Sequence, residues 1–190
     1  MTTVMNSLDH FVPGMLKTVV LAYDGYSISL ATDTDQWNGL EEFYTNSCFP
    51  DFPSVWPRSL HLKIAGFGIR EPVDKDEVIR MKNDLLQHPE IRERQITVFM
   101  TEDELDLLND TIGTYNILGT ENPIWKRFPY NETKHLMMCV RPMRVLEDDD
   151  IEVNVLFRGP NYQDGEMAKA IEETEKMVKW RNEISEKFSG

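Results

Sequence analysis

Two histidines, His61 and His135, have the positions in this sequence that best fit acid–base chemistry. Each stands near the start of a predicted strand, in the segments 61–64 and 135–138. An imidazole changes its charge near neutral pH, so a pair of them can act as the acid and the base of a phosphodiester cleavage. The sequence assigns no catalytic residue beyond these two candidates.

These two segments resemble the paired strands of the two-histidine phosphoesterases, in which a histidine and a nearby serine or threonine on each strand face a cleft and cleave RNA or cyclic nucleotides. The resemblance implies a phosphodiesterase-like or nucleotide-binding domain that uses His61 and His135. In this sequence Lys63 and Met137 stand where the hydroxyl residues belong. The competing interpretation is two half-buried histidines at the ends of a sheet.

Other motifs for phosphate, metal or nucleophile chemistry are missing. Gly66-Phe67-Gly68 lacks the third glycine and the following helix of a dinucleotide site. Cys48 and Cys139 stand far apart without a second cysteine near either, which indicates free thiols rather than zinc ligands. The adjacent acids of the turn 147–150 point alternately to opposite sides and do not converge on one cation. We expect no metal and no cofactor, and the sequence leaves enzymatic activity undecided while favouring a protein that is not an enzyme.

Net charge limits the partners. The chain has 33 acidic and 20 basic side chains, a formal net charge of −13 and a pI of about 4.7. Because phosphate binding needs a basic face, we expect no direct binding of nucleic acid and no membrane binding. The partner that fits is a basic or nucleic-acid-handling protein.

Acidic blocks and aromatic residues beside basic ones are the candidate binding surfaces. Carboxylates at helical spacing could imitate a nucleic-acid backbone, and aromatic and arginine side chains dominate interface hot spots. The simpler alternatives are solubility for the acids and anchoring of loops for the rings. The candidate partner-binding residues are Glu102, Asp103, Asp106, Asp110, Glu147, Asp148, Asp149, Asp150, Trp56, Trp125, Lys126, Arg127, Phe128 and Tyr130.

Hydrophobic periodicity and breaker residues predict the elements. The predicted strands are 16–23 and 26–32, joined by Asp24-Gly25 as a hairpin, then 60–69, 95–100, 134–145 and 151–158. The predicted helices are a short one within 35–46, one from Asp74 to about Gln87, one that begins at Thr101, and a long one over 164–187. Three prolines in 48–58 predict an extended loop.

This pattern predicts one α+β domain over residues 1–190, with residues 1–14 as a lead-in segment. We expect a mixed or antiparallel sheet of about six strands, three to four helices, and the long C-terminal helix packed on the sheet.

The first functional hypothesis is a non-enzymatic acidic protein that binds and inhibits or modulates a larger, basic protein partner. A viral accessory protein that acts on a host nuclease or defence complex, with nucleic-acid mimicry as one mechanism, is its concrete version. The alternative is a structural subunit of a viral or other assembly. Because no signal peptide and no apolar run of about 20 residues is present, we expect a cytoplasmic location.

Overall fold

In the computed structural model, seven strands form a single sheet in the order β1-β2-β3-β4-β7-β6-β5. The structure describes residues 12, 14–21, 34–113, 125–146, 150–163, 165 and 172. The elements are β1 (Thr18–Leu21), α1 (Asp35–Asn38), β2 (Glu42–Phe49), α2 (Phe52–Ser59), β3 (Ile64–Ile69), α3 (Lys75–Leu85), β4 (Glu93–Met100), α4 (Glu102–Ile112), β5 (Lys126–Pro129), β6 (His135–Val145) and β7 (Ile151–Arg158).

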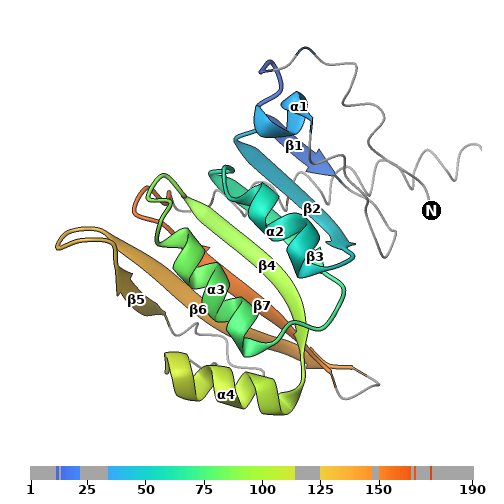
Figure 1. Ribbon diagram of the computed structural model, residues 1–190, viewed down its shortest axis with the longest axis vertical. Helices are drawn as coiled ribbons and strands as arrows, with labels where there is room; N and C mark the ends of the chain where they lie inside the picture. The colour runs from blue at the N-terminus through green and yellow to red at the C-terminus, as the bar shows by residue number, and fades with distance from the viewer. Residues whose placement is uncertain are drawn as a thin grey trace, which may run out of the picture.

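The first half of the sheet is parallel. Strands β1 to β4 are added in one direction, each parallel to the one before. Right-handed crossovers then place their connecting helices on the same face, and Figure 1 shows α2 and α3 side by side on the viewer's side of the sheet. Every residue of β3 is buried, as expected for a central parallel strand.

The second half is antiparallel. Strand β7 pairs with β4 and β6, and β6 pairs with the short edge strand β5. Helix α4 follows β4 and lies beside α3. The Glu104 carboxylate joins the N-termini of these two helices, because it accepts a hydrogen bond of 2.9 Å from the backbone N–H of Lys75.

The core lies between the sheet and its helices. Alternate residues of β4 (Ile96, Val98, Met100) face the helices and are fully buried. Their neighbours Gln95, Thr97 and Phe99 face the other side and are partly exposed. We call that second side the open face, since none of the four described helices packs on it.

The predicted fold class is wrong. Strands hold 39% of the described residues and helices 28%, the sheet has seven strands rather than about six, and all four helices are short. A long C-terminal helix is not shown, and residues 164–187 lie outside the described residues except Gly165 and Glu172. The combination of helices with a sheet is confirmed.

Two local predictions fail for physical reasons. Residues 42–49 form β2 instead of continuing a helix, because Phe43 and Phe49 alternate with partly exposed residues along a strand. The proline-rich segment forms α2: Asp51 caps it, Pro53 lies in its first turn, and only Pro57 removes an internal hydrogen bond. Burial of apolar side chains on one side of α2 outweighs that loss.

Other elements match their predictions. Helix α3 begins at a complete capping box of Asp74 and Glu77, and α4 begins at Thr101 and ends at Gly113, which has a φ of 68°. The strands predicted at 134–145 and 151–158 are β6 and β7, which pair with a register shift beside Pro142. The predicted hairpin of 16–23 with 26–32 stays a prediction: β1 pairs in parallel with β2 along one edge, and residues 22–33 lie outside the described part.

Candidate functional site

The two histidines lie in different parts of the sheet. The His61 imidazole contacts the backbone carbonyl of Trp37 at 2.9 Å, and its ring meets the Trp37 ring edge-on. His135 begins β6, and β4 and β7 lie between β6 and the strand that follows His61. The structure therefore gives His61 a local packing contact and does not place the two rings against one another.

The acidic residues of α4 share a solvent-exposed surface. Asp103, Asp106 and Asp110 are exposed, as is Glu102 at the first helical position. Leu107 lies among them and is 46% exposed, although Leu105 and Leu108 are buried on the opposite side of the helix. We call Asp103, Asp106, Leu107 and Asp110 the acidic face of α4.

No ion pair or hydrogen bond of the described residues involves the carboxylates of this face. Some acids elsewhere are paired: Glu41 contacts Lys17 and Lys63, and Glu152 contacts Arg144. The carboxylates of the acidic face therefore have no ion-pair partner within the described chain, and the Lys126 ammonium lies near Gly113 at the end of the helix. The other predicted acidic block is described only at Asp150, because residues 147–149 lie outside the described residues.

Trp56 is part of the core and not of a binding surface. Its side chain is 0% exposed, stacks on Phe52, and donates a hydrogen bond of 2.9 Å to the Asp84 carboxylate. The prediction of Trp56 as a partner-binding residue came from reading its segment as a loop. The segment is a helix that buries this ring against α3.

The predicted cluster from Trp125 to Tyr130 is split between two faces. Lys126 and Phe128 point to the helix side, where the Lys82 ammonium lies 4.9 Å from the Phe128 ring centre. The Tyr130 hydroxyl donates to the backbone carbonyl of Leu85 at the end of α3. Strand alternation sends Trp125 and Arg127 to the open face instead.

Arg158 is a feature that the sequence did not reveal. Its guanidinium lies 4.3 Å from the centre of the Trp125 ring and 4.3 Å from that of Tyr162. The Nε atom is buried and has no hydrogen-bond partner. An arginine that ends a strand looks ordinary in a sequence, and nothing there brings the distant Trp125 ring to it.

A hollow of about 540 Å³, lined by both polar and apolar side chains, lies on the open face. Its floor includes Gly68, where the Cys48 sulfur fills the space that a Cβ would need, and its wall includes the pair Thr97–Asn154, joined by a hydrogen bond of 2.8 Å. Burial, and then the nearby Glu152 carboxylate, raise the pKa of the Cys48 thiol. A protonated thiol is a poor nucleophile, so the hollow shows no activated group.

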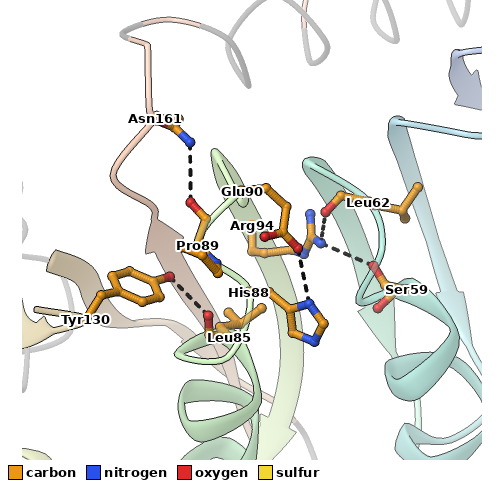
Figure 2. Close-up of polar contacts among 9 residues, drawn as sticks. All are labelled: Ser59, Leu62, Leu85, His88, Pro89, Glu90, Arg94, Tyr130 and Asn161. Atoms are coloured by element: carbon orange, nitrogen blue, oxygen red, sulfur yellow. Dashed lines mark hydrogen bonds and ion pairs between the residues drawn. The ribbon is translucent and has the colours of Figure 1, made fainter. Parts of the chain in front are cut away.

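Arg94 is buried without an anionic hydrogen-bond partner. Figure 2 shows its guanidinium donating to the backbone carbonyls of Ser59, at 3.1 Å, and of Leu62. Burial lowers the pKa of Arg94 to about 9, so the side chain stays charged at pH 7. These contacts fasten the end of α2 to β4, which is a structural role.

Within the described residues, no group of three His, Cys, Asp or Glu side chains could hold a metal ion. In the same part of the chain, no helix has the length and apolar character that a membrane span requires. Comparison with protein-family models, with curated proteins and with solved structures finds no match. The geometry of the chain's own residues carries the functional argument.

Proposed function

We propose that this protein acts by binding, not by catalysis, and that the acidic face of α4 docks on a larger, basic protein. The observation that supports this most is the set of unpaired carboxylates around an exposed leucine. A central apolar side chain within a charged rim is the arrangement that protein interfaces favour.

The position of Asp110 adds to the argument. It lies in the last turn of α4, where the helix dipole disfavours a negative charge, and that turn has no basic residue. A carboxylate at this position lowers the stability of the helix. A basic group of a partner would form a favourable contact with this carboxylate. Carboxylates around a binding site also raise the rate of association with a basic partner.

Modulation of the partner follows if the bound α4 covers its basic surface. Where that surface is a nucleic-acid groove, the row of carboxylates would compete with nucleic acid. If the partner bound this protein and nucleic acid at the same time, competition with nucleic acid would be excluded. Docking of the acidic face of α4 on the partner would still be possible.

Affinity capture from native lysate, followed by mass spectrometry, tests the proposal when it is run with paired variants. Asp106→Asn/Asp110→Asn changes the net charge by the same amount as Glu71→Gln/Glu132→Gln, which alters two exposed acids outside α4. The proposal predicts that one basic protein is captured by wild type and by the second variant but not by the first. Equal capture by both variants would contradict it.

A further inference from the structure

The Arg158 side chain occupies a rigid setting at the end of β7. The chain turns back after Gly159, whose N–H donates to the Arg92 carbonyl at 2.9 Å, and Tyr162 N–H bonds to the Gly159 carbonyl at 3.1 Å. A Cβ at Gly159 would stand 1.9 Å from the carbonyl oxygen of Ile91. The turn therefore admits only glycine there, and the Tyr162 ring that follows it lies 4.3 Å from the guanidinium.

Two aromatic rings contact this guanidinium, and no described residue binds its N–H groups. The rings are those of Trp125 and Tyr162. A guanidinium has five N–H donors, yet no hydrogen bond or ion pair joins Arg158 to any described residue, and its buried Nε has no partner. A stacked arginine with a free edge is oriented in advance for bidentate binding of an oxyanion.

A second arginine lies on the same row of the sheet. Arg158 is opposite Met137 on β6, and Met137 is opposite Arg127 on β5. Opposed residues of antiparallel strands share a face, so both arginines lie on the open face about 10 Å apart along the backbone. Arg127 is exposed and has no ion pair within the described chain.

We propose that Arg158, assisted by Arg127, binds the phosphate group of a small phosphorylated ligand on the open face. Neither arginine has an ion pair within the described chain, and together they match a group that carries close to two negative charges near neutral pH, even though Glu93 is opposite Arg158 on β4. A carboxylate carries only one. This site is separate from the acidic face of α4, so it adds a ligand to the proposed protein docking.

Inorganic phosphate is the probe, and the Arg158 Nε–Hε signal in a ¹H–¹⁵N spectrum of the full chain is the readout. The titration is run at constant ionic strength with chloride. We expect a saturable shift that is stronger at pH 7.5 than at pH 5.5, because inorganic phosphate gains most of its second negative charge between these two pH values. Acetate and a short single-stranded oligonucleotide serve as the other two anions.

Three variants complete the test. In Arg127→Gln, removal of one charge-assisted contact should weaken phosphate binding by about tenfold. Arg158→Lys keeps the charge but loses the bidentate edge, and should weaken it by at least as much, read from the remaining shifted amides. Arg144→Gln is the matched control, because Arg144 is on the same sheet but its Nε donates a hydrogen bond of 2.5 Å to the Glu152 carboxylate. This variant should bind phosphate within about twofold of wild type.

Several results would overturn the proposal. These are the absence of a saturable shift with phosphate, an equal response to acetate, and equal losses in Arg144→Gln and Arg158→Lys. Binding of the oligonucleotide without binding of free phosphate would assign the site to nucleic acid instead. Unfolding curves of each variant show whether a lost shift reflects lost binding or lost structure, and Trp125→Phe, which keeps a ring beside Arg158, should retain binding.

Discussion

The Trp56 indole donates a hydrogen bond of 2.9 Å to the Asp84 carboxylate and so joins α2 to α3. Trp56 belongs to a segment with three prolines, and Asp84 lies near the end of the following helix. The contact explains why α2 holds its place despite Pro57: its buried side chains and this polar bond fix it against its neighbour.

Trp56→Phe keeps an aromatic ring in the core and removes the hydrogen bond. We expect a loss of about 1–3 kcal/mol in the free energy of unfolding, since the partly buried Asp84 carboxylate loses a donor. Trp56→Ala should cost about 3–5 kcal/mol because it also leaves a cavity. Urea unfolding measures both. If Trp56 served a partner instead, the variants would lose binding while keeping their stability.

Arg94 gives a second prediction about stability. Arg94→Lys replaces a fork that reaches two carbonyls by a single ammonium, which should leave a buried carbonyl of Ser59 or Leu62 unpaired. The expected cost is about 1–3 kcal/mol in urea unfolding. Arg94→Met removes the buried charge as well as the hydrogen bonds. A methionine variant as stable as wild type would show that the arginine does not fasten α2 to β4.

Tyr130 predicts a dependence on alkaline pH. Burial, and then the Glu90 carboxylate, raise the pKa of Tyr130 to about 12 from 10.0. Below pH 10 the phenol is protonated in both states, and its bond to the Leu85 carbonyl is fully present. As pH rises from 10 through 12, the unfolded phenol ionises first, so the contribution of Tyr130 to stability falls.

The comparison that checks this is the stability of wild type against Tyr130→Phe at several pH values. The variant should be less stable by about 1 kcal/mol at pH 8, and the gap should shrink as pH rises above 10. A gap that stays constant up to pH 12 would show that Tyr130 is not protected from ionisation by the fold.

Asp110 predicts a stabilising substitution. Asp110→Asn removes a negative charge from the last turn of α4 and should raise the free energy of unfolding by about 0.3–1 kcal/mol. Asp103→Asn removes a charge from the first turn, where the dipole favours it, and should lower stability by a similar amount. If both variants lost stability equally, the Asp110 carboxylate would stabilise the fold, and its position would not support binding of a partner.

Local signals predicted much of the fold. The acids that follow Asp74 and Thr101 marked the starts of α3 and α4 because capping depends on residues three apart. Residues 42–49 were harder: Phe43 and Tyr44 fit a helix stripe as well as a strand, and only the pairing of β2 with β1 and β3 decides between them. The long-range pairing, which local patterns do not contain, sets the sheet order.

The candidate surfaces show the same limit. The carboxylates of α4 were found from helical spacing, because an exposed helix face is a local property. The division of Lys126 and Arg127 between two faces follows from strand alternation, which a loop interpretation hid. The Arg158 stack needs a turn and an edge strand to meet, so no segment of the sequence signals it.

The affinity of the captured partner for purified protein, measured at low and high salt, tests the central claim most directly. The account predicts that Asp106→Asn/Asp110→Asn weakens binding by at least about fivefold at low salt and removes most of the salt dependence. Glu71→Gln/Glu132→Gln should bind as wild type does. Equal losses in the two variants, or an affinity that does not change with salt in wild type, would contradict docking through the acidic face of α4.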